Sequence, residues 1–172
     1  LESLAEPGQP PRVRTAASRQ LAALRVQMRD FQGARAALGE APDTNSEAAL
    51  QAIARYEAGK DKSHVVGGLL GLVPGLGYAY AGEYANAARS LLLNALCIWG
   101  LVEFIEEDLW GGVALAGFAE VTFYSGSIYG GADAAVRYNR RRLQQCTDTI
   151  EGDVEVRPNR AALPVLTLNY TF

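Results

Sequence analysis

The chain is poor in the side chains that build metal centres and disulfide scaffolds. Its 172 residues include one His and two Cys, namely His64, Cys97 and Cys146. These are too few for a Cys/His metal site or a disulfide-rich fold. The glycine-rich segments lack a following Gly-Lys-Ser/Thr sequence, so they do not match a phosphate-binding loop. No nucleophile stands beside a base in the sequence. We therefore expect no metal, no cofactor and no enzyme activity.

The chain also lacks a large excess of charge of either sign. It has 16 Lys and Arg against 19 Asp and Glu, a formal net charge of −3, which argues against nucleic-acid binding. Apolar residues crowd into the middle, whereas charged residues gather towards the ends. This segregation predicts four regions: an extended leader (1–14), an amphipathic helical region (15–62), a membrane domain (63–142) and a polar tail with a terminal strand (143–172).

The leader is rich in proline, with Pro7, Pro10 and Pro11. Proline lacks the amide hydrogen that a helix uses, so an extended conformation is predicted. The leader has neither an initiator Met nor the basic-then-apolar pattern of a signal peptide. We expect that a signal peptide has already been removed or that the chain is a fragment.

Residues 15–62 have the spacing of short amphipathic helices, with apolar residues at intervals of three and four. Thr15 is the predicted cap of the first helix, and a turn is predicted at residues 29–30. Pro42 is predicted to end the second helix, and Asn45 or Ser46 to cap the third. The side chains predicted to face inward are Leu21, Leu24, Met28, Phe31, Ala34, Ala37, Leu38, Leu50, Ile53, Ala54 and Tyr56.

The stretch from residue 30 to residue 38 resembles the helix junction of a tetratricopeptide repeat. Phe31, Ala34 and Leu38 match the packing positions of that repeat. The resemblance covers one repeat at most, and Arg25 stands where the family usually has an apolar residue. A single repeat cannot bury its own apolar face, so we expect it to pack on another element. A generic helical hairpin is the alternative interpretation.

Three apolar runs fill the middle of the chain. Residues 65–82 contain no charged side chain, and residues 87–105 and 109–129 are each long enough for a spanning helix, which needs roughly 20 residues. We predict an all-α membrane protein in which the second and third runs form a transmembrane helical hairpin. The alternative is that the runs form the buried core of a soluble protein.

The first run is predicted to be broken. The sequence Pro74-Gly75-Leu76-Gly77 interrupts it near the middle, and proline removes a backbone donor that a straight helix needs. We therefore predict a broken, re-entrant or interfacial segment instead of a full span. Small residues spaced by four permit close helix contact. The glycines predicted to serve such packing are Gly67, Gly71, Gly75, Gly126 and Gly130.

The charges around the apolar runs predict the topology. The connection between the second and third runs, residues 103–108, is acidic, whereas basic residues flank the other ends of the runs. A hairpin places all basic flanks on one side, which would be cytoplasmic in an inner membrane. The side chains expected to anchor this side, or to contact anionic lipid headgroups, are Arg137, Arg140, Arg141 and Arg142.

The sequence Pro74-Gly75-Leu76-Gly77-Tyr78-Ala79-Tyr80-Ala81-Gly82, followed by two apolar runs with an acidic connection, resembles a family of small two-helix bacterial membrane domains. These domains open with Pro-Gly-x-Gly-x-x-Tyr-x-Gly. Residues 127–140 are also similar to the corresponding part of uncharacterised envelope proteins that carry the domain. The resemblance covers roughly residues 65–142. It implies a membrane domain and no established activity, so no catalytic residue follows from it.

Two polar side chains interrupt the second and third runs. Glu120 lies where an ionised carboxylate is costly, so it should be protonated or paired and should face protein. Asn94 and Glu120 lie equally far from the connecting loop, so a hairpin would bring them to the same depth. We predict an intramembrane hydrogen bond between Asn94 and Glu120, within one chain or between two copies. A proton or ion relay through Glu120 is the functional alternative.

The last eight residues alternate in character, which is typical of a strand. A lone strand needs an edge to pair with. The ending, with its terminal Phe, resembles the carboxyl-terminal signal of bacterial outer-membrane β-barrels, although the chain lacks the strands that a barrel requires. The strand could be donated to a partner, or the tail could pack on its own helices or a neighbouring subunit. The side chains on its apolar face are Leu166, Leu168, Tyr170 and Phe172.

These features predict a non-enzymatic integral membrane subunit or assembly factor of a bacterial envelope complex, in the inner or the outer membrane. The expected partners are the lipid bilayer, other envelope membrane proteins and further copies of the chain in a homo-oligomer, but not nucleic acid. The alternative is a small oligomeric transporter or channel component that uses Glu120.

Overall fold

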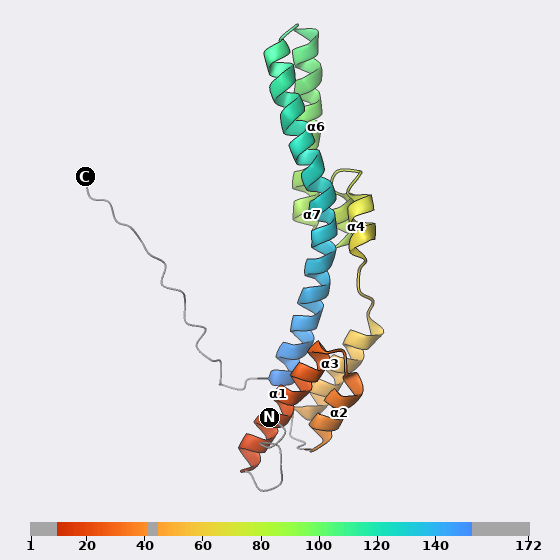
Figure 1. The fold of residues 1–172 in the computed structure, drawn as a ribbon, viewed down its shortest axis with the longest axis vertical. Helices are drawn as coiled ribbons and strands as arrows, with labels where there is room; N and C mark the ends of the chain where they lie inside the picture. The colour runs from red at the N-terminus through yellow and green to blue at the C-terminus, as the bar shows by residue number, and fades with distance from the viewer. Residues whose placement is uncertain (1–9, 41–44, 153–172) are drawn as a thin grey trace, which may run out of the picture. The chain divides into compact units, whose positions relative to one another are not determined.

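The computed structural model describes residues 10–40 and 45–152, and their regular structure is entirely helical. Contacts divide the chain into two units, residues 1–53 with 147–172 and residues 54–146. Figure 1 shows the helices in chain order. The predicted all-α fold is therefore confirmed for the described residues. The predicted strand, with Leu166, Leu168, Tyr170 and Phe172, lies outside them.

The first unit contains α1 (Pro11–Gln27), α2 (Phe31–Glu40) and the start of α3 (Ser46–Ala58). The prediction that Thr15 caps the first helix and that residues 11–14 are extended was wrong, because α1 begins at Pro11. Proline fits the first position of a helix, where its fixed φ is already helical and an amide hydrogen is not needed. The proline-rich sequence therefore starts a helix here.

The predicted turn between the first two helices is present at residues 29–30. Arg29 has a φ of 64°, the left-handed conformation that ends α1. The Asp30 carboxylate then accepts a hydrogen bond from the Gly33 amide at 2.9 Å, which caps the start of α2. This tight connection returns α2 along α1.

The inward faces of these helices differ in part from the prediction. Ala34, Ala37, Leu38, Ile53 and Tyr56 are buried as predicted. Leu24, Met28, Leu50 and Ala54 are exposed, so their inward assignment was wrong. The buried residues of α1 are mostly small ones on the neighbouring face, because close packing of helices selects small side chains over long ones. The side chains that fill this core instead are Ala17, Ala22, Ala23, Val26, Ala49, Ala52 and Ile150.

The second unit contains α4 (His64–Leu70), α5 (Leu76–Tyr80), α6 (Tyr84–Glu106) and most of α7 (Trp110–Glu151). The long helices α6 and α7 run antiparallel and are joined by a short turn at Asp108, whose φ is 55° (Figure 1). Helix α7 continues through Glu151. Residues 143–151, which were assigned to a polar tail, are therefore helical.

The first apolar run is broken, as the Pro74–Gly77 sequence predicted, into α4 and α5. The amides of Gly71, Leu72, Val73 and Leu76 bond to carbonyls of the same segment at 3.0–3.2 Å. The Gly75 amide donates to the Ser127 hydroxyl of α7 at 3.2 Å. Pro74 has no amide hydrogen and needs no acceptor. Together these bonds therefore give every backbone N–H from residue 71 to residue 76 an acceptor.

Glycine brings this broken segment into backbone contact with α7. A Cβ atom on Gly67 would lie 2.5 Å from the Gly131 carbonyl oxygen, and one on Gly71 would lie 2.6 Å from that of Ser127. A Cβ on Gly77 would lie 2.4 Å from the Gly67 carbonyl oxygen. No other residue fits at these positions without a shift of the backbone.

We expect Gly131→Ala to destabilise the second unit by about 1–3 kcal/mol, because the new methyl group would overpack the contact with α4 and α5. Its Cβ would lie 2.6 Å from the Gly67 carbonyl oxygen and 2.9 Å from the Gly77 Cα. Gly126→Ala is the matched control on the same helix, since nothing lies within 4 Å of that Cβ position. Thermal unfolding in detergent would measure both variants. Equal midpoints would contradict the role of close backbone contact.

Candidate functional site

Large apolar side chains are exposed along α6 and along the first half of α7. Helix α6 is the one described helix that is long and apolar enough to cross a membrane, and 6% of its apolar stretch is buried. Residues 109–129 are long enough but less apolar than α6, because Glu120 and several hydroxyl side chains interrupt them. Those that are more than half exposed are Tyr84, Leu91, Leu92, Ile98, Trp99, Trp110, Leu115, Phe118, Val121 and Tyr129.

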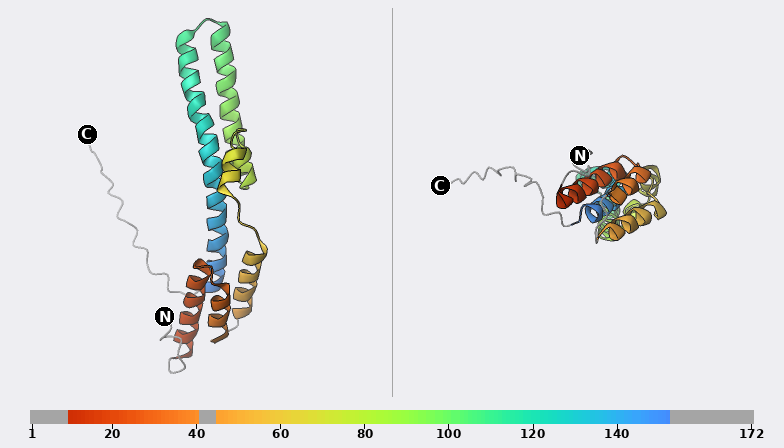
Figure 2. Two further views of the ribbon diagram at one scale, coloured as in Figure 1. Left: turned by 45° about the vertical axis from the view of Figure 1, so that its right-hand side comes forward. Right: turned by 90° about the horizontal axis from the view of Figure 1, so that it is seen from below.

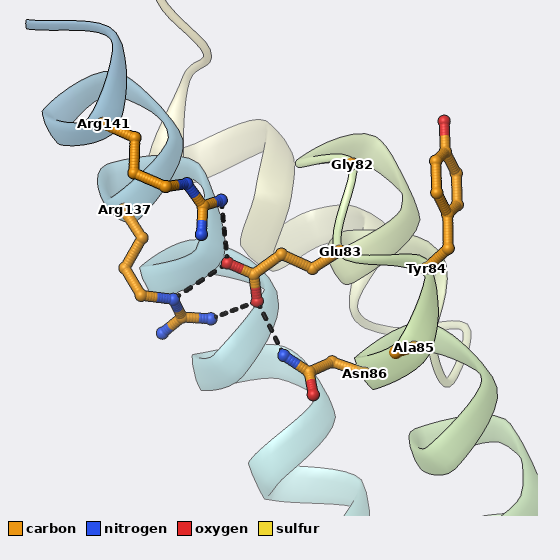
Figure 3. Close-up of a pocket in the computed structure, with 7 residues that line it drawn as sticks. All are labelled: Gly82, Glu83, Tyr84, Ala85, Asn86, Arg137 and Arg141. Carbon is orange, nitrogen blue, oxygen red and sulfur yellow. Dashed lines mark hydrogen bonds and ion pairs between the residues drawn. The ribbon is translucent and has the colours of Figure 1, made fainter. Parts of the chain in front are cut away.

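A carboxylate surrounded by donors lies at the start of α6 (Figure 3). Glu83 Oε1 accepts from Arg137 Nε and Arg141 Nη2, each at 3.0 Å. Glu83 Oε2 accepts from Arg137 Nη2 at 2.7 Å and from Asn86 Nδ2 at 2.8 Å. Four donors fill the acceptor sites of one carboxylate, and Arg137 binds it in the bidentate geometry that arginine favours.

The backbone before α6 sets the position of Glu83. Gly82 has a φ of 80°, which an L side chain rarely adopts, and nothing crowds its Cβ position. This conformation lets the Glu83 amide donate to the Tyr78 carbonyl at 2.9 Å, and so closes α5. The chain then turns into α6 with the Glu83 side chain directed at α7, whereas Tyr84 points away from the cluster (Figure 3).

The ion pairs lower the pKa of Glu83 to about 2, chiefly through the hydrogen bonds from Arg137, which outweigh the effect of burial. The same contact with Glu83 raises the pKa of Arg137. The Glu83 side chain is 9% exposed, whereas the Arg137 and Arg141 side chains are 38% and 50% exposed. Glu83 is therefore the least exposed member of the three, and the two guanidinium groups reach the surface around it.

The four predicted anchor arginines have different environments. Arg137 also pairs with Asp133, one turn away on α7. Arg142 binds inward: its guanidinium donates to Asp61 Oδ1 at 2.9 Å and to the Tyr56 carbonyl at 2.7 Å. Arg140 is exposed. Arg140 and Arg141 are thus the more exposed of the four, whereas Arg142 holds the segment after α3 against α7.

The same segment is held by a second set of contacts. Asn139 exchanges two hydrogen bonds with the Lys62 backbone, at 2.8 and 2.9 Å. The Lys62 ammonium lies 4.1 Å from the centre of the Tyr138 ring and also donates to the Tyr80 carbonyl. These contacts fix the entry to α4, where the Ser63 hydroxyl accepts from the Val66 amide as the helix cap.

The structure does not contain the predicted hydrogen bond between Asn94 and Glu120 within one chain. Asn94 is 1% exposed and donates through Nδ2 to the Ser90 carbonyl at 2.7 Å, on its own helix. Asn94 Oδ1 and Glu120 Oε2 are buried without a hydrogen-bond partner.

The register of the hairpin explains why the two side chains miss each other. Gly112 faces Phe104 and Gly117 faces Leu101, which places Glu120 level with residues 96–98 of α6. Asn94 is therefore about one helical turn away. Pairing of Asn94 with Glu120 between two copies stays a prediction.

The predicted glycine faces are only partly used for close contact. Gly67 and Gly71 face α7, and Gly75 adopts a φ of 90° against the Ala87 carbonyl of α6. Gly130 lies under the Tyr78 ring, whereas the Cβ position of Gly126 is open. The sequence reasoning missed Gly77 and Gly131, although both belong to the same glycine-rich stretches.

Glu83 and Asn86 were also missed. They lie between two apolar runs, and the two arginines that bind Glu83 are more than 50 positions away along the chain. A charged residue directly beside Gly82, at the start of an apolar helix, was the available signal. The part of the chain that the structure describes holds no group of three His, Cys, Asp or Glu residues that could bind a metal.

We expect Glu83→Gln to destabilise the second unit at neutral pH by about 1–3 kcal/mol, because two arginines lose a charged acceptor. The pKa of Glu83 is lower in the fold than its ordinary 4.5. Its stabilisation is therefore present above pH 4.5 and is lost as the pH falls towards 2. Thermal unfolding across this range should show a smaller acid dependence for Glu83→Gln than for the parent chain.

Asp133→Asn is the control for that experiment, because the Asp133 side chain is 64% exposed. An exposed ion pair contributes about 0.2–1 kcal/mol, so this variant should keep the acid dependence of the parent. A parent chain whose stability does not change between pH 5 and pH 2 would contradict the assignment to Glu83.

No protein-family model, no curated protein and no solved structure matches this chain. The resemblances to a two-helix membrane domain, to a tetratricopeptide repeat and to a barrel signal therefore remain predictions from the sequence.

Proposed function

We propose that the chain is a non-enzymatic integral membrane protein of the bacterial envelope, which acts as a subunit or assembly factor of a larger complex. The α6–α7 hairpin is its anchor in lipid. The observation that carries the proposal is the exposure of α6, whose apolar stretch is 6% buried. The core helix of a soluble protein has the opposite property, because its apolar face is covered.

The length of the hairpin supports a bilayer as its surroundings. At 1.5 Å per residue, α7 extends about 40 Å from Trp110 to Arg137. A bilayer with its headgroups is about 40–45 Å thick. The Arg137–Glu83 pair would then lie at one headgroup layer, and the acidic turn at Asp108 would lie at the other. Exposed aromatic rings fit both borders, with Trp110 beside the turn and Tyr84 and Tyr129 nearer the arginines.

The break between α4 and α5 also suits an apolar environment. Irregular backbone is tolerated at membrane depth only where its polar groups are satisfied by protein. Each amide from residue 71 to residue 76 has an acceptor, and the Tyr124 hydroxyl donates to the Leu72 carbonyl at 3.0 Å. These hydrogen bonds support a re-entrant segment that enters the bilayer from the basic side and returns to the same side.

The recruiting parts of the proposed subunit lie outside the hairpin. The helical first unit, with its exposed Leu24 and Met28, is one candidate contact for other envelope proteins. The alternating end of the chain, residues 165–172, is the other. In this proposal the hairpin fixes the chain in the membrane, and the helical first unit and the end of the chain bind partners.

We expect the protein to stay in the membrane fraction after alkaline carbonate treatment and to need detergent for release. Single cysteines in a Cys97→Ser, Cys146→Ser chain would map the topology. A cysteine at Glu107 and one at Arg140 should react with an impermeant reagent from opposite sides of sealed vesicles, because the acidic turn and the arginines flank one span. Release of the protein by carbonate, or labelling of both positions from one side, would contradict the proposal.

Deletion of residues 165–172 should abolish co-purification of the native partner while the protein remains in the membrane. The physical reason is that a strand binds by adding to the edge of another sheet, so that its loss removes the contact. Affinity purification in detergent, followed by subunit identification, would measure this. Replacing Leu166 and Leu168 with Ala is a milder version, with Thr167→Ala on the other face as its control. Full retention of the partner without residues 165–172 would place recruitment elsewhere.

The second candidate function is a small oligomeric transporter or channel component. The observation that favours it is Glu120 Oε2, a buried acceptor without a partner inside one chain. Ion flux in liposomes that is lost in Glu120→Ala would support this function. If Glu120 is neutral and structural, Glu120→Gln should keep both assembly and function, because the amide retains the hydrogen-bonding capacity.

A further inference from the structure

The α4–α5 pair is apolar on its outer side as well as at its contact with α7. Val65 and Leu69 on α4 are 56% and 62% exposed, and Val73 in the break is 54% exposed. Leu72 and Leu76 are exposed beside them. The inner side, by contrast, is formed by the glycines that touch α7. The pair therefore carries an uncovered apolar surface of its own, separate from that of the hairpin.

This apolar pair lies beside only one half of the hairpin. The Tyr124 hydroxyl bonds to the Leu72 carbonyl at the inner end of the pair, and Asn139 bonds to Lys62 at its outer end. Figure 2 (left) shows α4 and α5 beside the part of α6 and α7 that is farther from the connecting turn. A section across the hairpin near the arginines thus passes through α4, α5, α6 and α7, whereas a section near Asp108 passes through α6 and α7 alone.

The depth of the pair matches one leaflet. Tyr124 lies about 20 Å from Arg137 along α7, whereas a whole bilayer with its headgroups is about 40–45 Å thick. With Arg137 at the headgroups, the tip of the break would reach the middle of the bilayer. The pair would therefore take up area in the leaflet on the basic side and none in the opposite leaflet.

We propose that α4–α5 is a wedge in one leaflet, and that the protein therefore prefers strongly curved membranes with its basic side on the convex face. This inference rests on the proposed membrane function. Apolar side chains inserted into one leaflet expand that leaflet and bind best where lipid packing is already loosened by curvature. The occupant of the outer apolar surface is lipid, because the exposed Arg140 follows Asn139 at the outer end of the pair, where it would meet anionic headgroups.

The experiment compares two sizes of vesicle in one reconstitution. The full chain, with a fluorophore at its amino terminus, is incorporated into phosphatidylcholine vesicles with about 20% phosphatidylglycerol and diameters of about 50 and about 400 nm. An impermeant quencher separates copies with the amino terminus outside from those with it inside. Fluorescence per lipid is then measured vesicle by vesicle for each orientation.

The expected result has opposite signs for the two orientations. Copies with the basic side outside should be about threefold denser on the small vesicles, because the wedge then lies in the expanded outer leaflet. Copies with the basic side inside should be depleted from the small vesicles. If the chain without substitutions has the same density on small and large vesicles in both orientations, the wedge proposal is wrong.

A pair of matched variants locates the effect. Leu69→Ser with Val73→Ser removes apolar surface from the wedge at exposed positions and should flatten the size dependence. The control, Leu115→Ser with Val121→Ser, removes the same two residue types from the opposite half of the hairpin, where they are 71% and 67% exposed. This variant should keep the dependence of its density on vesicle size. Equal loss in both variants would contradict the assignment to α4–α5.

Failure of this inference is distinguishable from failure of the membrane proposal. A chain that resists carbonate extraction but shows no size dependence would retain the hairpin anchor and lose only the wedge. A chain that carbonate extracts from the vesicles would overturn the anchor itself.

Discussion

The contact of α4 and α5 with α7 is the constraint on which the second unit depends. It requires backbone to approach backbone at Gly67, Gly77 and Gly131, where a single methyl group would lie within 3 Å of a neighbouring backbone atom. The approach is so close that Ser127 and Tyr124 of α7 reach the irregular backbone of the break and satisfy it. Without this contact, the Gly75 amide and the Leu72 carbonyl of the break would be left unpaired, and an apolar environment would penalise each by several kcal/mol.

The same contact determines where the charged cluster forms. Packing of α5 against α7 places Gly82 beside the arginines, and its left-handed conformation then turns Glu83 towards Arg137. A bidentate ion pair in this position ties the start of α6 to α7 and closes the base of the hairpin. At the other end the helices are joined only by the turn at Asp108. The basic end of the hairpin is thus the broad, cross-linked one, and the acidic end is the narrow one.

The sequence predicted the local features of this fold well and the contacts across it poorly. The break at Pro74, the turn at residues 29–30 and the existence of α1, α2, α3, α6 and α7 follow from proline, glycine and apolar spacing, which act within a few residues. Glu83 was missed because its partners are brought to it only by the packing of α5 on α7. Leu24 and Met28 were assigned inward because they are large and periodic, but alanines form the close contact instead. The start of α1 was predicted too late, because proline was taken as a sign of extended chain. Proline in fact suits the first turn of a helix, and α1 begins at Pro11.

The two buried polar groups of the hairpin illustrate the limit of counting residues. Equal distance from the loop placed Asn94 opposite Glu120, yet the register set by Gly112 against Phe104 and Gly117 against Leu101 offsets them by a turn. Asn94 then turns to the Ser90 carbonyl of its own helix, an option always open to an asparagine in the middle of a helix. Each side chain keeps one acceptor without a donor. In a lipid environment, where no water competes, such acceptors are the groups with most to gain from a second copy of the hairpin.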